Sequence, residues 1–173
     1  RVSFDLIYAR PGQSESDWEA ELARALSFDT GHLSLYQLTI EDGTVFGRMH
    51  QQGLLRGLPA DDLGADFWDL TQELCEAGGL PAYEVSNHAR PGQESRHNLV
   101  YWNYGDYAGV GPGAHGRLSI GGARYATAAP KDPAAWLKQA LSQHVDDNPV
   151  RLRRDEQSTE FLLMGLRLRE GIS

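Results

Sequence analysis

Residues 4–40, FDLIYARPGQSESDWEAELARALSFDTGHLSLYQLTI, decide the fold. The apolar run Phe4–Tyr8 predicts a short strand. Ser14 is placed to cap a helix, with Asp17 three residues later, and apolar side chains then repeat along one helical face. These side chains are Trp18, Leu22, Ala25 and Leu26. Because His32–Ile40 is a second β-prone run, the stretch predicts a β-α-β unit with parallel strands and a right-handed crossover.

The alternation of helix and strand continues after this unit. Thr44–Gln52 is short and weakly patterned, but a strong helical repeat begins near Asp61 and ends at Gly78. Its apolar positions are Leu63, Phe67, Leu70, Leu74 and Ala77. Ala82–Asn87 then predicts another strand, and a second α-then-β step indicates a parallel α/β sheet.

The composition of the sequence changes after residue 87. Residues 88–130 are rich in glycine and aromatic residues and predict loops with one hairpin, formed by Arg117–Ile120 and Ala123–Ala128 around a Gly-Gly turn. Helical patterns return at Asp132, which precedes a proline, and near Asp155.

Composition excludes several classes of function. The chain has 173 residues with 16 basic and 24 acidic side chains, a net charge of −8, which argues against binding nucleic acid. No apolar run approaches the roughly 20 residues that cross a bilayer, so we expect a cytoplasmic protein without a membrane span. Cys75, the single cysteine, sits in a helical pattern and is expected to be a buried structural thiol. The sequence opens directly on an apolar strand-like run and stops just after the apolar segment Phe161–Leu168, which suggests a piece of a longer polypeptide.

Asp5 is a carboxylate inside an apolar strand, where burial without a partner is costly. Strand alternation places Asp5 and Ile7 on the face opposite Phe4, Leu6 and Tyr8. Polar groups near the carboxyl ends of parallel strands often face a ligand, and Thr39, at the end of the second strand, has a similar position. The alternative is an Asp5 side chain that only satisfies nearby backbone or arginine groups.

The densest group of chemically useful side chains is Arg96–Trp102, followed by Tyr104 and His115. A flat, anionic porphyrin needs an imidazole for its iron, aromatic faces for its rings and arginines for its propionates, and all three types occur here. The alternative is a hydrogen-bonded structural histidine. The remaining histidines lack metal-ligand spacing and are expected in loops or on the surface: His32, His50, His88 and His144.

Three long segments together carry a family resemblance: FDLIYARPGQSESDWEAELARAL with HLSLYQLTIEDGTVF, YEVSNHARPGQESRHNLVYWNYGDYAGVGPGAHG, and FLLMGLRLREGI. They resemble the HemW branch of the oxygen-independent coproporphyrinogen III oxidase-like radical S-adenosylmethionine proteins. The resemblance implies an α/β fold: residues 1–90 as the later half of a partial (β/α)6 TIM-like barrel, and residues 91–173 as the HNxxYW region and the start of an α+β, helical C-terminal region.

The family's cofactors are S-adenosylmethionine and a 4Fe-4S cluster held by a CxxxCxxC motif. This chain has no such motif, so we expect that it cannot cleave S-adenosylmethionine by itself. By resemblance, Asp5 lines the S-adenosylmethionine pocket, and Thr39 is a second, weaker contact. Ala9 and Arg10 replace a typical Gly-Leu pair, which predicts an adjusted backbone and an added charge at the rim of the pocket.

The HNxxYW motif is associated in the HemW branch with haem. The resemblance therefore implies His97 as the ligand of the haem iron, Asn98, Tyr101 and Trp102 as haem-site residues, and His115 as the reserve ligand. Three functions stay open: a haem chaperone that hands haem to haemoproteins, an oxidase that converts the propionates of coproporphyrinogen III to vinyl groups, and a motif that only braces the loop region. The sequence leaves open whether the protein is an enzyme.

Overall fold

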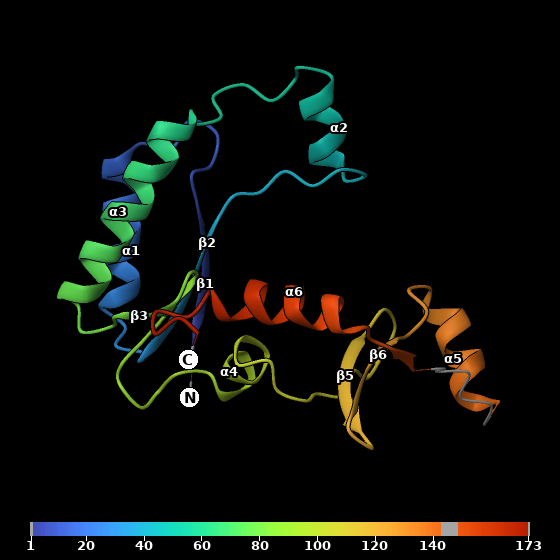
Figure 1. Ribbon diagram of the computed structural model, residues 1–173. Coiled ribbons are helices and arrows are strands. Elements are labelled where there is room, and N and C mark those ends of the chain that lie inside the picture. Colours follow the sequence, from blue (N-terminus) through green and yellow to red (C-terminus); the bar gives the residue numbers. More distant parts are fainter. Residues whose placement is uncertain (1, 143–148, 173) are drawn as a thin grey trace. The chain divides into compact units, whose positions relative to one another are not determined.

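The computed structural model describes residues 2–142 and 149–172 (Figure 1). Its contacts divide the chain into two compact units, unit 1 from Arg1 to Glu94 and unit 2 from Ser95 to Ser173. His144, expected on the surface, lies outside the described residues.

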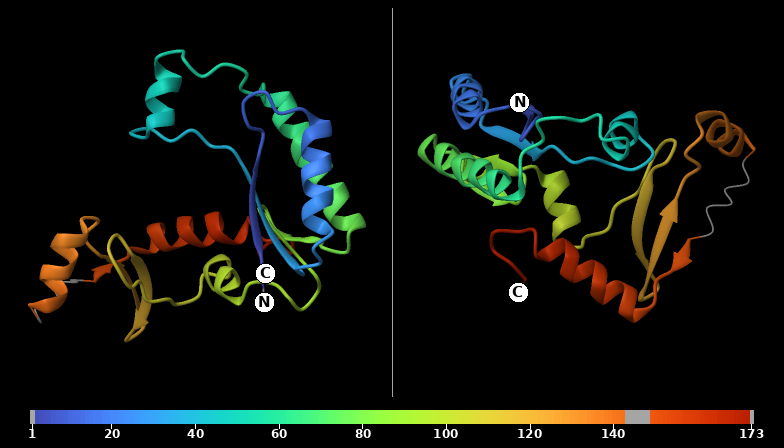
Figure 2. Two further views of the ribbon diagram at one scale, coloured as in Figure 1. Left: turned by 180° about the vertical axis from the view of Figure 1, so that it is seen from behind. Right: turned by 90° about the horizontal axis from the view of Figure 1, so that it is seen from above.

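Unit 1 is a four-stranded sheet covered on one face by helices. Its elements are β1 (Phe4–Tyr8), α1 (Glu15–Leu26), β2 (His32–Gln37), α2 (Val45–Gln51), α3 (Asp61–Ala77), β3 (Ala82–Glu84) and β4 (Asn87–Ala89). The strand order is β1-β2-β4-β3, and β1 runs parallel to β2 with Phe4 opposite Leu33 and Tyr8 opposite Gln37. Helices α1 and α3 lie side by side against the sheet (Figures 1 and 2). The predicted β-α-β unit is confirmed.

The apolar stripe of α1 builds the core of unit 1. The Ser14 hydroxyl accepts the Asp17 N–H at 3.1 Å and the Asp17 carboxylate accepts the Ser14 N–H at 3.1 Å, a reciprocal cap that fixes where α1 begins. Trp18 and Leu22 are fully buried, and the Trp18 indole N–H donates to the Thr71 hydroxyl of α3 at 2.9 Å. This pair satisfies the polar groups between the two helices while their apolar faces pack together.

The expected third parallel strand at 82–87 is wrong. The chain turns at Val85-Ser86, so that β3 and β4 form a hairpin, and β4 pairs antiparallel with both β3 and β2. The Glu84 carboxylate accepts the Ser86 N–H at 2.9 Å and the side-chain amide of Asn87, which stabilises this tight turn. A two-residue turn can join only antiparallel strands, so β4 is antiparallel to β3 and pairs with β2 in place of it.

Two further boundaries in unit 1 differ from expectation. Strand β2 ends at Gln37 rather than at Ile40, and the weakly patterned segment after it contains the helix α2. The Thr44 hydroxyl caps that helix by accepting the Gly47 N–H at 2.9 Å. This cap therefore starts a helix that the short apolar pattern of the segment does not predict.

Unit 2 combines a three-stranded antiparallel sheet with short helices. Its elements are α4 (Arg96–Trp102), β5 (His115–Ile120), β6 (Ala123–Ala128), α5 (Pro133–Leu141), β7 (Val150–Arg151) and α6 (Arg154–Gly165), and the strand order is β5-β6-β7. The predicted hairpin and the helices after Asp132 and near Asp155 are confirmed. Residues 96–102, expected to be a loop, form α4 because the Ser95 hydroxyl accepts the Asn98 N–H at 3.3 Å.

Candidate functional site

Helix α4 divides the HNxxYW motif between two faces. Residues four apart share a helical face, so His97 lies with Tyr101 and Asn98 lies with Trp102. The rings of His97 and Tyr101 meet edge to face, with centroids 4.6 Å apart and planes at 90°. The Tyr101 ring in turn contacts the Tyr107 ring at 4.3 Å and 70°. We call His97, Tyr101 and Tyr107 the aromatic row.

The aromatic row is accessible from solvent. His97 is exposed, and Tyr101 and Tyr107 are half-buried. Arg96, the residue before His97, is also exposed, so a cation is available within one residue of the imidazole. An imidazole in this state can bind a metal that arrives from outside without any rearrangement of the core. His115, the reserve ligand, is exposed at the start of β5.

The second face of α4 packs within unit 2. Trp102 is half-buried, and the guanidinium carbon of Arg167 lies 4.4 Å from the centroid of its ring. The Trp102 indole N–H is buried, and none of the residues described in the structure accepts it. Helix α4 also contacts α6. Trp102 was expected among the haem-site residues, and this geometry favours a packing role for it; Asn98 on the same face is half-buried.

A polar network holds the segment that follows α4. The Glu160 carboxylate of α6 accepts three hydrogen bonds from the Arg117 guanidinium at 2.8–3.2 Å and one from the Tyr104 hydroxyl at 3.1 Å. The Arg124 guanidinium stacks 3.8 Å from the Tyr104 ring centroid and donates to the Gly105 carbonyl at 2.9 Å. Hydrogen bonds from Arg117 hold the pKa of Glu160 below its ordinary value, whereas burial raises the pKa of Tyr104. The network keeps residues 104 and 105 in place.

Tyr107 is a member of the aromatic row that sequence reasoning did not select. Its backbone forms a bridge with Arg117, in which each N–H donates to the other's carbonyl at 2.8 Å. This bridge fixes Tyr107 beside the hairpin and so places its ring against Tyr101. The sequence spacing does not predict the contact between Tyr101 and Tyr107, because a turn and a strand pairing bring the two rings together.

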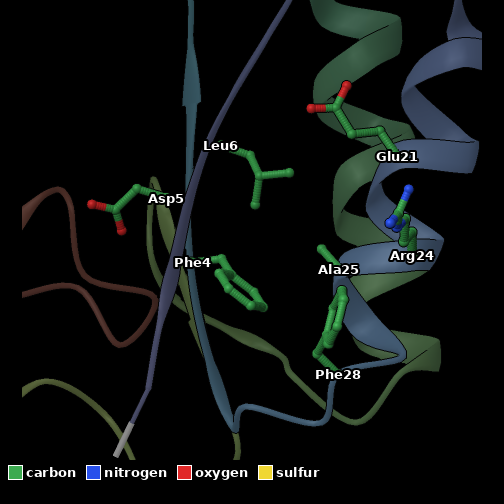
Figure 3. A pocket seen from close by; sticks show the side chains of 7 residues that line it. All are labelled: Phe4, Asp5, Leu6, Glu21, Arg24, Ala25 and Phe28. Atoms are coloured by element: carbon green, nitrogen blue, oxygen red, sulfur yellow. The ribbon is translucent and has the colours of Figure 1, made fainter.

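Asp5 lies on the uncovered face of the sheet in unit 1. Its carboxylate is exposed, so the burial cost that first drew attention to it is not incurred. It is also the second residue of a five-residue strand rather than a residue at the strand's carboxyl end. Figure 3 shows Asp5 pointing to the opposite side of β1 from Phe4 and Leu6, whose side chains point toward α1. Alternation along β1 therefore matches the prediction.

A cavity of about 410 Å³ lies beside β1. Its lining is both charged and apolar: Asp5, Leu6, Ile7, Arg10, Pro11, Glu21, Leu38 and Phe46. Thr39 is exposed two residues beyond the end of β2, whereas Asp5 is level with Ser34 near the start of that strand, so Asp5 and Thr39 lie at different heights along the sheet. The structure does not bring the two predicted residues together.

The two departures from the family pattern at the rim are both visible. Ala9 keeps the left-handed backbone conformation that favours glycine, with φ of 57°. Arg10 forms an ion pair with Glu21 of α1, so the added charge at the cavity is partly neutralised.

The environments of His88 and Cys75 do not favour metal binding. His88 was expected in a loop or on the surface, but it lies in β4 with 1% exposure, and burial lowers its pKa to about 4. Cys75 is buried as predicted, and burial raises the pKa of its thiol to about 12, which keeps it unreactive. Residues 2–142 and 149–172 contain no cluster of histidine, cysteine and acidic side chains that could hold a metal ion.

Known proteins resemble the chain along its whole length. No family model matches it. The radical S-adenosyl methionine domain-containing protein 1, mitochondrial, of Danio rerio is 39% identical over 178 residues, which cover 100% of this chain and 40% of that protein. The protein named Heme chaperone HemW of Bacillus subtilis is 37% identical and is aligned over 99% of this chain and 44% of its own length. HemW of Lactococcus lactis gives the same three values.

Along its whole length, the chain is similar to HemW-like radical S-adenosylmethionine proteins. It spans about two fifths of the length of these curated relatives. The solved structure of coproporphyrinogen III oxidase (HemN) from Escherichia coli, a radical SAM enzyme, matches 96% of this chain and 40% of that chain with a TM-score of 0.66 at 20% identity. That likeness confirms the predicted α/β fold as part of a radical-SAM fold.

The comparisons leave the location of the chain open. None of the helices described in the structure is long and apolar enough to cross a membrane. The relatives in Danio rerio and Mus musculus carry the word mitochondrial in their names. A cytoplasmic location therefore stays a prediction.

Proposed function

We propose that this chain binds haem on unit 2, with His97 as the iron ligand, as part of a HemW-type haem chaperone. The observation that carries the proposal is the exposed His97 ring held at 90° to Tyr101 on one face of α4. An axial imidazole stands perpendicular to the macrocycle that it ligates. A ring perpendicular to that imidazole, as Tyr101 is, can therefore lie flat along the macrocycle.

Charge favours unit 2 over unit 1 for an anionic ligand. Unit 1 has six basic and sixteen acidic residues, whereas unit 2 has ten basic and eight acidic residues. The negative net charge of unit 1 would repel two propionates, whereas the slightly positive net charge of unit 2 would accept them. Arg96, exposed beside His97, is the cation that we assign to a propionate.

The openness of the site supports transfer rather than storage. A haem whose iron sits on an exposed imidazole is reachable by a second protein, and a carrier has to release its cargo to a recipient. We therefore propose haemoproteins as the recipients. Asn98 and Trp102 act on the inner face of α4 and hold the helix that presents His97.

The uncovered sheet face of unit 1 fits one end of S-adenosylmethionine. The exposed Asp5 carboxylate beside the 410 Å³ cavity is a suitable acceptor for the ligand's ammonium group, whereas Thr39 does not line this cavity. The chain's residues do not fit a 4Fe-4S cluster. Such clusters are held by several thiolates, and the single cysteine, Cys75, is buried.

The test is a haem titration of this chain, followed at the Soret band. The variants are His97→Ala, His115→Ala and, as a matched control, His50→Ala, which removes another exposed histidine on α2 of unit 1. We expect saturable binding that only His97→Ala abolishes. Equal binding by the wild type and His97→Ala would overturn the assignment, and loss in His115→Ala alone would transfer the iron to β5.

A second assay separates carriage from chemistry. The recovered porphyrin is analysed by mass after incubation with a full-length protein that carries both this chain and the CxxxCxxC motif. Haem that keeps both propionates supports the chaperone, whereas loss of carbon dioxide from coproporphyrinogen III would support the oxidase instead.

A further inference from the structure

The aromatic row extends beyond the residues of the HNxxYW motif. His97 and Tyr101 come from α4, but Tyr107 comes from the segment that pairs with β5. Successive ring centroids lie 4.6 Å and 4.3 Å apart, so Tyr107 stands one ring contact farther from the imidazole than Tyr101 does. A flat ligand with its centre on His97 would reach Tyr107 with its outer part.

Tyr107 is anchored through its backbone. Both of its backbone hydrogen-bonding groups are used in the bridge to Arg117, and the Arg117 side chain is fixed by Glu160. Its ring is half-buried and therefore keeps a surface for contact. Aromatic binding surfaces are effective when little side-chain freedom is lost on binding, which this anchoring provides.

We propose that Tyr107 is a further porphyrin-binding residue, which contacts the periphery of the macrocycle and acts independently of the iron. The inference rests on the proposed haem function of the same surface. Its chemical basis differs, since His97 recognises the metal and Tyr107 recognises a flat conjugated ring. A metal-free porphyrin should therefore depend on Tyr107 and not on His97.

The experiment titrates this chain with haem and, separately, with metal-free protoporphyrin IX. The variants are Tyr107→Leu, Tyr107→Phe and His97→Ala, with Tyr36→Leu as a control for loss of a 43% exposed tyrosine in unit 1. We expect Tyr107→Leu to weaken both ligands by about threefold to tenfold, the usual worth of one aromatic contact. Tyr107→Phe and Tyr36→Leu should bind as the wild type does.

The outcomes separate this inference from the proposed function. If Tyr107→Leu binds both ligands like the wild type while His97→Ala loses haem, the inference fails and the iron ligand stands. If His97→Ala keeps haem while Tyr107→Leu weakens metal-free protoporphyrin IX, the iron assignment fails and the inference stands. If circular dichroism shows that Tyr107→Leu does not fold, Tyr107→Ser is compared with Tyr107→Phe instead. Equal affinities of these two folded variants for metal-free protoporphyrin IX would overturn the inference.

Discussion

The two units of this chain are stabilised by different means. The core cluster lies entirely in unit 1, where Trp18, Leu22 and Phe67 are fully buried. Among the described residues of unit 2, only Gly116, Arg124 and Gly165 are buried. Unit 2 is held instead by the Arg117, Glu160 and Arg124 hydrogen bonds.

This difference explains where a ligand surface is available. Unit 1 also exposes large apolar side chains, among them Phe28, Tyr36 and Trp68, but its six basic and sixteen acidic residues give it a strongly negative charge. In unit 2 the polar network fixes the backbone and leaves aromatic and apolar side chains at the surface, including the aromatic row. A large exposed apolar surface is typical of a binding region.

The largest expected effect is on the core of unit 1. Phe67→Ala removes a fully buried ring and should lower the free energy of unfolding of unit 1 by about 3–5 kcal/mol. Phe46→Ala, at a ring that is 43% exposed, is the matched control and should cost far less. Native-state hydrogen exchange of unit 1 amides measures both. Equal losses in the two variants would show that this ring is not part of a packed core.

The two units should lose stability at different pH values as the pH is lowered. Burial holds the pKa of His88 at about 4 against an ordinary 6.5, with Glu84 and His32 as its charged neighbours. Below pH 6.5 the unfolded chain therefore binds a proton at His88 that the folded chain does not bind. The free energy of unfolding of unit 1 falls by up to about 3 kcal/mol as the pH drops from 6.5 to 4. Unit 2 responds later, since the lowered pKa of Glu160 makes its stability fall only as pH drops below 4.5.

Urea unfolding of the wild type and His88→Phe at several pH values tests this separation. The variant should lose most of the pH dependence between 6.5 and 4. Parallel curves for the two proteins would remove His88 as the cause, and earlier loss of unit 2 amides in hydrogen exchange would reverse the order.

A smaller effect tests the polar network of unit 2. Glu160→Gln removes the charge that accepts from Arg117, and hydrogen bonds to charged groups contribute about 1.5–3 kcal/mol. We expect a loss in this range, confined to unit 2. Glu170→Gln, at an exposed carboxylate, is the control. An unchanged stability of unit 2 in Glu160→Gln would contradict the claim that polar contacts hold it.

The smallest effect concerns Asp5. Because its carboxylate is exposed, Asp5→Asn should change the free energy of unfolding by less than about 0.5 kcal/mol. A loss above about 1 kcal/mol in urea unfolding would instead indicate a structural role.

Local patterns predicted most elements, and tertiary pairing set the rest. Ser14 and Trp18 were enough to place α1, because a cap and an apolar stripe are local signals. The hairpin at Val85-Ser86 was missed, since Glu84 bonds across a turn that an apolar run hides. The neighbours in the candidate site follow the same rule: His97 and Tyr101 meet through helical spacing, whereas Tyr107 depends on a bridge to Arg117.

Hydrogen exchange of the whole chain with and without bound haem tests the central claim most directly, that the porphyrin surface lies on unit 2. We expect slower exchange across residues 96–107 and no change in unit 1. Slower exchange at residues 5–11 and 38–46, around the cavity of unit 1, with residues 96–107 unchanged, would contradict it.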